Sequence, residues 1–321
     1  MERNLALDAA RVTEAAALAS ARMMGLGDAH QADDVAVQAM RRAFRSLDIC
    51  GTIVVGEGHY EESPRLYYGE KVGRWAAGDP EVRLALDALE GARLCAQGRP
   101  DAMSVIAMAR NGSFMPAPDT YMDKIVVGPT GMGAIDITRS VSHNLQSVAD
   151  AKGVYVEDIT VAILDRPRHE QTMREIREAG ARIRMIVGGD LSAALATCRE
   201  ETGIDMVIGV GGAPEGVLAA AALRCVGGEI QCRLRPRNDE EREMIRTSGL
   251  DAEEVYTTDQ LASGHVLFAA TGITDGHFLE GVRFLSGGAR TNSVVMRSKT
   301  MTVRYIEAHH HFDRKPDYGD F

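Results

Sequence analysis

Three apolar stretches of the sequence are each followed by a carboxylate that lies next to a glycine. Asp87 and Glu90 close one stretch, and Gly91 comes directly after them. Glu57 lies between two glycines, and Glu215 lies in the segment Gly-Gly-Ala-Pro-Glu-Gly. Carboxylate oxygens suit hard divalent cations, and glycine lets a phosphate group approach the main chain closely. We therefore predict that three strand ends bring these acids together around a cation that binds phosphate.

Two arginines could bind an anionic substrate. Arg166 and Arg168 are held apart by Pro167, directly after a predicted strand at residues 159–164. A basic surface turn would explain this pattern equally well, if it stood alone. However, the segment 188–190, Gly-Gly-Asp, follows the next predicted strand, and open α/β sheets bind ligands at the carboxyl ends of their strands. This placement favours a phosphate clamp.

Other chemically interesting residues have plain structural explanations. Asp33 or Asp34 could cap a helix predicted at about 33–47. The segment 209–214 has proline where a dinucleotide-binding fingerprint has its last glycine, which argues against a nicotinamide site. The three histidines at 309–311 are interpreted as an exposed polar tail rather than as metal ligands. A carboxylate-rich site with little histidine favours Mg²⁺ or Mn²⁺ over Zn²⁺.

The composition limits the function classes that need considering. The chain has 321 residues and a net charge of -10, so we expect no nucleic-acid partner. Its five cysteines are odd in number and widely spaced, which predicts neither a disulfide framework nor a thiolate zinc site. The N-terminal segment does not resemble a signal peptide, and no apolar run is long enough to cross a membrane. We therefore expect a cytoplasmic protein with no membrane partner.

The pattern of elements changes near residue 158. Residues 1–157 read as short strands with long helices, one of them at about 5–24. Residues 158–321 begin with regular alternation of strands and helices, which indicates a mostly parallel sheet with helices on its faces. We predict an α/β protein with an α+β N-terminal half: a metal-binding half, 1–157, and a sugar-phosphate-binding half, 158–321.

Over almost its whole length the sequence resembles the class II (GlpX-type) fructose-1,6-bisphosphatases, of the lithium-sensitive sugar-phosphatase superfamily. The segments that carry the resemblance are 11–14, 51–58, 67–73, 124–129, 167–169, 211–216, 270–274 and 313–315. The resemblance implies a layered αβαβα sandwich and a homodimer or homotetramer. It also implies Mg²⁺- or Mn²⁺-dependent hydrolysis of the 1-phosphate of fructose 1,6-bisphosphate, and in some members of sedoheptulose 1,7-bisphosphate.

The resemblance further implies roles for individual residues. The metal ligands would be Asp33, Glu57, Asp87, Glu90 and Glu215. The substrate contacts would be Glu90, Gly91, Tyr121, Arg166, Pro167, Arg168, Gly188, Gly189, Asp190 and Gly212. The catalytic positions would be Glu61, Asp87, Glu90 and Ala92.

The chain departs from the family pattern at five positions around the implied pocket. Ala92 replaces the threonine whose hydroxyl is thought to help orient and activate the attacking water, and Glu61 replaces an aspartate. Ala29 replaces a lysine, Asp34 a glycine and Gly188 an aspartate. Because the ligand set is retained, we expect a phosphatase acting on an altered sugar bisphosphate, such as one with seven or eight carbons. The alternative is a catalytically impaired homologue that acts as a sugar-phosphate-binding or regulatory subunit.

Overall fold

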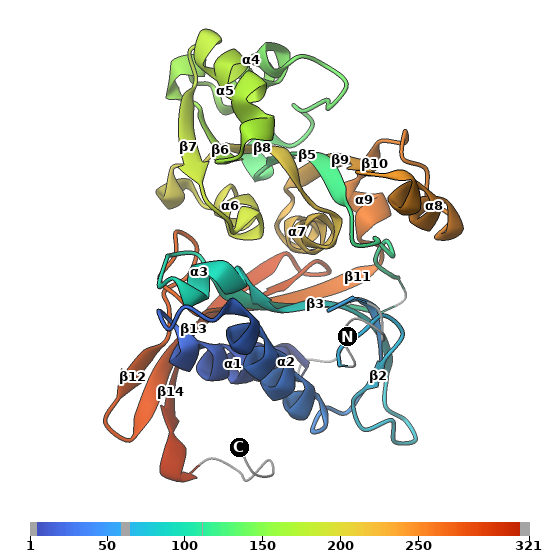
Figure 1. The fold of residues 1–321 in the computed structure, drawn as a ribbon, viewed down its shortest axis with the longest axis vertical. Coiled ribbons are helices and arrows are strands. Elements are labelled where there is room, and N and C mark those ends of the chain that lie inside the picture. Colours follow the sequence, from blue (N-terminus) through green and yellow to red (C-terminus); the bar gives the residue numbers. More distant parts are fainter. Residues whose placement is uncertain (1–4, 59–64, 111, 315–321) are drawn as a thin grey trace. The chain divides into compact units, whose positions relative to one another are not determined.

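The computed structural model describes residues 5–58, 65–110 and 112–314, which form two compact units (Figure 1). Unit 1 comprises Met1–Ser113 and Gly264–Phe321, and unit 2 comprises Phe114–Ser263. This division differs from the boundary predicted at residue 157, because the strands after residue 264 pair with the N-terminal sheet. Each unit contains a mixed sheet with helices, which confirms the predicted α/β class. No helix in the described part of the chain is long and apolar enough to cross a membrane.

Within the described residues, unit 1 holds an eight-stranded sheet in the order β12-β13-β11-β4-β3-β1-β2, with β14 also paired to β13. Strands β1 and β3 are parallel, whereas the other pairs are antiparallel. Helices α1 and α2 pack against each other and against this sheet, burying one apolar core (Figure 1). The strands are β1 (Cys50–Val55), β2 (Lys71–Val72), β3 (Glu81–Glu90), β4 (Met103–Arg110), β11 (His265–Gly272), β12 (Arg283–Leu285), β13 (Gly288–Arg297) and β14 (Thr302–His311).

The helices of unit 1 are α1 (Leu5–Ser20), α2 (Ala29–Phe44) and the short α3 (Ala92–Ala96). Helix α2 starts four residues before the predicted position 33, because the Asp28 side chain caps it by accepting the Gln31 N–H at 2.9 Å. Asp33 therefore lies inside the helix and does not cap it, so the capping interpretation was wrong.

The three histidines at 309–311 belong to β14, so the prediction of a tail was wrong, but His309 and His311 are exposed as predicted and His310 is half-buried. They are ordered by the pairing of β14 with β13, which places Ala289 opposite His310. The Nε2 atom of His310 lies 2.8 Å from the Thr291 hydroxyl. Because side chains alternate along a strand, His310 faces away from its two histidine neighbours, and the three cannot point at one metal ion.

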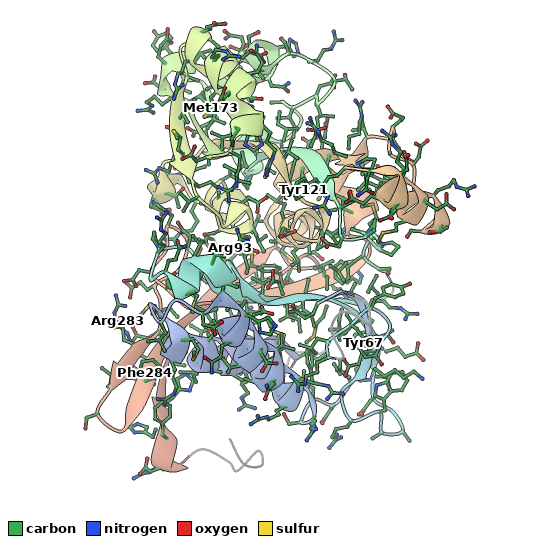
Figure 2. All side chains as sticks on the ribbon, viewed as in Figure 1. Tyr67, Arg93, Tyr121, Met173, Arg283 and Phe284 are labelled. Atoms are coloured by element: carbon green, nitrogen blue, oxygen red, sulfur yellow. The ribbon has the colours of Figure 1, made fainter. Side chains whose placement is uncertain are left out.

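Unit 2 holds, among its described residues, a six-stranded sheet in the order β10-β9-β5-β8-β6-β7. The predicted alternation of strands and helices is present, but only β8, β6 and β7 are parallel. Strand β5, which begins at Tyr121 (Figure 2), runs antiparallel between β8 and β9, so the sheet is mixed rather than mostly parallel. The strands are β5 (Tyr121–Val127), β6 (Thr160–Leu164), β7 (Arg182–Ile186), β8 (Met206–Gly212), β9 (Glu229–Arg235) and β10 (Tyr256–Thr257). The helices are α4 (Val141–Lys152), α5 (Glu170–Glu178), α6 (Asp190–Ala196), α7 (Ala213–Val226), α8 (Asp239–Thr247) and α9 (Thr258–Leu261).

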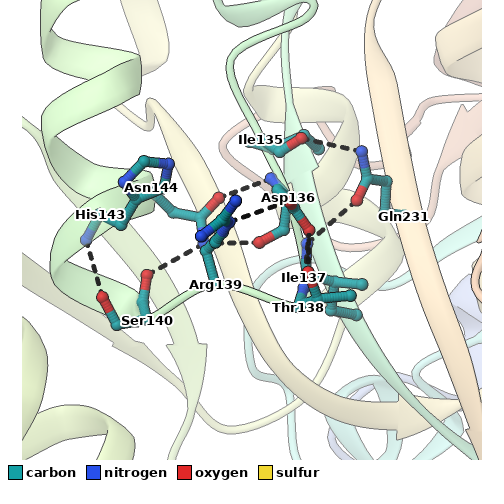
Figure 3. Close-up of polar contacts among 9 residues, drawn as sticks. All are labelled: Ile135, Asp136, Ile137, Thr138, Arg139, Ser140, His143, Asn144 and Gln231. Atoms are coloured by element: carbon teal, nitrogen blue, oxygen red, sulfur yellow. Dashed lines mark hydrogen bonds and ion pairs between the residues drawn. The ribbon is translucent and has the colours of Figure 1, made fainter.

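A polar network fixes the loop between β5 and α4 (Figure 3). The buried side-chain amide of Asn144 donates to the Asp136 and Ser140 carbonyls, and its oxygen accepts the Asp136 N–H at 2.7 Å. From β9, Gln231 accepts the Ile137 N–H at 3.0 Å. The bonds to the Asp136 and Ile137 N–H groups satisfy backbone donors outside the helices and strands, so α4 and β9 together hold this loop of unit 2.

Candidate active site

Asp87 and Glu90 share one face of β3 because the strand carries a bulge between them. On β4, Val105 lies opposite Asp87 and Met103 lies opposite Glu90. These two β4 residues are two positions apart, so they share a face, as do their partners on β3. Two residues of β3 therefore oppose the single residue Ser104, which is the geometry of a β-bulge. A regular strand would have pointed the two carboxylates to opposite faces.

Gly91 ends β3 and begins α3 in a conformation that favours glycine. Its φ is +84°, and a Cβ atom there would lie 3.0 Å from the Leu94 Cδ1 atom. The chain therefore turns immediately after Glu90, and Ala92 becomes the first residue of α3. The half-buried Ala92 thus occupies a helix start directly after the carboxylate pair.

Glu57 is tied to this bulge by a hydrogen bond. Its Oε1 atom accepts the Ala88 N–H at 3.0 Å. Glu57 follows β1, and the preceding Gly56 admits no side chain because a Cβ atom would overlap the Leu66 carbonyl oxygen. Burial, and then the negative charge of Asp33, raise the pKa of Glu57 to about 7. The two carboxylates are therefore close enough to repel each other.

Asp33 supplies the second carboxylate of this pair from helix α2. Its own pKa is raised by burial and by the neighbouring Asp34, while His30 lowers it. Among residues 5–58, 65–110 and 112–314, no three His, Cys, Asp or Glu side chains form a ready-made metal cluster. The pair nevertheless fits a divalent cation, because oxygen donors whose charges repel each other are the groups that such a cation neutralises. Glu61 lies outside the described residues.

In unit 2 a buried lysine organises the predicted substrate residues. Lys124 of β5 is only 6% exposed, and its Nζ atom donates to Asp190 Oδ2 at 2.7 Å and to the Gly212 carbonyl at 2.9 Å. Glu215, in the first turn of α7, has its pKa raised by burial and by the charge of Asp190, whereas Lys124 lowers it. Asp190, Gly212 and Glu215 are thus brought together in this unit.

The sequence analysis did not identify Lys124 as a functional residue. It lies in the run Met-Asp-Lys-Ile-Val-Val, which reads as an ordinary apolar strand. A lysine in the middle of a buried strand is a usable signal, because lysine is almost never buried without a partner. That partner, Asp190, is distant in sequence and cannot be identified from the local pattern.

Replacing Lys124 by methionine is expected to lower the free energy of unfolding by about 3 kcal/mol, because it leaves the largely shielded Asp190 carboxylate, 13% exposed, without its lysine partner. Urea unfolding monitored by circular dichroism measures this loss. The double variant Lys124→Met/Asp190→Asn should regain most of it, whereas the exposed Lys299→Met control should change stability by less than about 0.5 kcal/mol. A single variant as stable as the wild type would contradict the assigned ion pair.

Glycines permit the close approach of Asp190 and Glu215 to the end of β8. A Cβ atom at Gly211 would overlap Asp190 Oδ2, and one at Gly212 would overlap Glu215 Oε2. Gly189 begins α6 with a φ of +72° and so places Asp190 in the first turn of that helix. The glycine-rich segment therefore lets two carboxylates lie against the end of β8.

The two predicted clamp arginines are fixed by main-chain carbonyls. Arg166 donates to the Val187 carbonyl at 2.7 Å, and Arg168 donates to the Val210 carbonyl at 2.8 Å. The guanidinium carbon of Arg168 also lies 4.9 Å from the centre of the Tyr121 ring. Both guanidinium groups therefore have defined orientations within unit 2, and the Tyr121 ring helps to orient that of Arg168.

His169 holds the clamp turn, the 3₁₀ helix η4 (Pro167–His169), against the sheet. Its ring is buried, with Nδ1 2.7 Å from the Leu164 carbonyl, and its Nε2 atom accepts the Val210 N–H at 2.8 Å. Accepting that hydrogen bond requires a neutral ring, and burial lowers the pKa of His169 accordingly. The sequence showed His169 only as part of a basic turn.

Comparison with known proteins identifies the family. The model of the family described as "Bacterial fructose-1,6-bisphosphatase, glpX-encoded" matches residues 3–310. The chain belongs to this family. A relative from Synechococcus elongatus, named D-fructose 1,6-bisphosphatase class 2/sedoheptulose 1,7-bisphosphatase, is 42% identical over 337 residues, covering 98% of each chain. A protein of the same name from Synechococcus sp. (strain JA-3-3Ab) is 42% identical over 334 residues, covering 97% of this chain and 96% of the relative.

Membership confirms the resemblance inferred from the sequence. It also confirms the predicted enzyme class, a phosphoric monoester hydrolase of the fructose-bisphosphatase type. The family consists of divalent-metal-dependent phosphatases. The relatives give no support to the alternative of a catalytically impaired subunit. The roles of the individual site residues stay predictions.

Proposed function

We propose that this protein removes one phosphate from a sugar bisphosphate, of the fructose 1,6-bisphosphate or sedoheptulose 1,7-bisphosphate type, using Mg²⁺ or Mn²⁺. The products are a sugar monophosphate and inorganic phosphate. The observation that carries the proposal is the bulge that aligns Asp87 with Glu90 and donates its Ala88 N–H to Glu57, in a chain of the fructose-bisphosphatase family. We further propose a homodimer or homotetramer, which sedimentation velocity would measure.

The metal ligands that we propose from the family resemblance are Asp33, Glu57, Asp87, Glu90 and Glu215. When bound, divalent cations stabilise charge on the transferring phosphoryl group and lower the pKa of the attacking water. Burial, and then the charge of Asp33, raise the pKa of Glu57, and a cation bound by the two carboxylates would offset both effects.

The substrate residues act through charge and shape. Arg166 and Arg168 bind a substrate phosphate with guanidinium groups that main-chain carbonyls already orient, so little entropy is lost on binding. Asp190 accepts a hydrogen bond from a sugar hydroxyl, and Lys124 holds the Asp190 carboxylate in place by a hydrogen bond. Gly91 and Gly212 are assigned substrate contacts from the family resemblance alone. Glu61 is assigned a catalytic role from the family resemblance alone.

The test is phosphate release from a panel of six-, seven- and eight-carbon sugar bisphosphates in the presence of Mn²⁺ or Mg²⁺. We expect turnover of at least one bisphosphate, loss of that turnover with EDTA, and its return when Mn²⁺ is added. The corresponding sugar monophosphates serve as controls and should release little phosphate. Protein that binds Mn²⁺ but turns over no member of the panel would refute the proposal and favour a binding or regulatory role.

A further inference from the structure

Helix α2 carries an arginine cluster that the proposed reaction does not use. Arg41 and Arg42 lie in the last turn of α2, and Arg45 caps the C-terminus of this helix, within about one turn of them. Together with Gln38 and Arg65 they line a pocket of about 180 Å³, here called the arginine pocket. Of the residues that the structure describes, none that lines this pocket is acidic. Four guanidinium groups therefore converge on one small concave surface.

Carboxylates behind the arginine pocket hold two of its arginines in place. Glu70, which is buried, accepts from the Arg41 Nε atom at 2.8 Å. Asp34 accepts from the Arg65 Nη1 atom at 2.7 Å and from the Gln38 side-chain amide at 2.6 Å. These contacts restrict the arginine side chains before any ligand binds, which reduces the entropy lost on binding.

The size and charge of the arginine pocket fit a phosphate group. A volume of about 180 Å³ is smaller than the roughly 300–1,000 Å³ of pockets that enclose drug-sized ligands. Guanidinium groups match the oxygens of a phosphate through paired hydrogen bonds. The chain as a whole has a net charge of -10, so a nucleic acid would be repelled beyond this local patch. A small phosphorylated ligand fits both the volume and the positive charge of the arginine pocket.

We propose that the arginine pocket binds a phosphate group, either inorganic phosphate or that of a small phosphorylated molecule. No arginine of the proposed substrate clamp lines the pocket, and Arg41 lies eight residues, about 12 Å of helix, beyond the proposed metal ligand Asp33. This proposal does not depend on the proposed reaction, because a binding measurement alone tests whether phosphate occupies the arginine pocket.

The experiment is calorimetric titration of inorganic phosphate into metal-free protein in EDTA. The test variant is Arg42→Gln/Arg45→Gln, which spares the arginines paired with Glu70 and Asp34. The matched control is Arg174→Gln/Arg177→Gln, which removes two exposed helical arginines at the same spacing. We expect the test variant to weaken phosphate binding by at least about tenfold and the control to change it by less than about twofold. Thermal unfolding verifies that both variants are folded.

A further variant separates the arginine pocket from the substrate clamp. Arg166→Gln/Arg168→Gln should retain the phosphate binding that Arg42→Gln/Arg45→Gln loses, whether or not the enzyme hydrolyses a sugar bisphosphate. A parallel titration with ribose 5-phosphate distinguishes the two sources of the group, because tighter binding than inorganic phosphate indicates a phosphorylated organic ligand and equal binding indicates phosphate alone. Binding that is unchanged in the test variant, or equally reduced in the control, would overturn the proposal.

Discussion

Replacing Glu57 by glutamine is expected to lower kcat/KM for the preferred sugar bisphosphate by about 10³-fold or more, because it removes a cation ligand from the site that stabilises transition-state charge. The amide oxygen can still accept the Ala88 N–H, so the tie to the β3 bulge is kept. Burial and Asp33 already disfavour the charged form of Glu57, so the substitution removes repulsion rather than a stabilising ion pair. We therefore expect the variant to fold normally.

Steady-state phosphate release at saturating Mn²⁺ measures the effect of Glu57→Gln. The control is Glu81→Gln, which removes one exposed carboxylate at the start of β3 in the same unit and should alter kcat/KM by less than about twofold. A Glu57→Gln variant that keeps more than a tenth of the wild-type activity would show that this carboxylate is not part of the catalytic centre.

Replacing Ala92 by threonine is expected to raise kcat by about 10²-fold, with little change in KM. The family resemblance assigns to this position a hydroxyl that helps to orient the attacking water, and comparable hydrogen-bonding groups contribute about 10²–10³ in kcat. Ala92 is half-buried at the start of α3, directly after Gly91, so a hydroxyl added there lies beside the end of β3. The gain should therefore come from the chemical step rather than from substrate binding.

A valine variant at position 92 distinguishes the effect of the threonine hydroxyl from the effect of its added volume. Ala92→Val has the shape of threonine without its oxygen and should give no gain on any sugar bisphosphate. Equal rates for the two variants would contradict the assigned role of the hydroxyl. No gain from threonine, in a wild-type enzyme that turns over another sugar bisphosphate, would show that a different group activates the water.

Elements with a clear local pattern could be predicted from the sequence. The strand predicted at 159–164 is β6 (Thr160–Leu164), because a short apolar run marks a strand that is buried in the sheet. The start of α2 could not be fixed, because Asp28, Asp33 and Asp34 are all good capping residues and only the backbone geometry selects Asp28. Local sequence thus identifies an element more reliably than its first residue.

Features that depend on long-range pairing could not be predicted. Strand β11 returns to the N-terminal sheet and pairs Thr271 with Ser104, so the compact units do not follow chain order. The bulge that aligns Asp87 and Glu90 is likewise defined only by the partner strand β4. The residue types and glycine spacing predict a carboxylate site, but the orientation of its side chains depends on contacts between distant segments.

The most direct test of the proposed metal centre is calorimetric titration of Mn²⁺ into metal-free wild-type protein, Glu57→Gln and Glu215→Gln. Our account predicts saturable Mn²⁺ uptake by the wild type. It also predicts binding at least about tenfold weaker in each variant, since loss of even an outer-shell partner of a metal ligand typically costs that much. Absence of Mn²⁺ uptake by the wild type, or wild-type affinity in either variant, would contradict the assignment of these carboxylates as ligands.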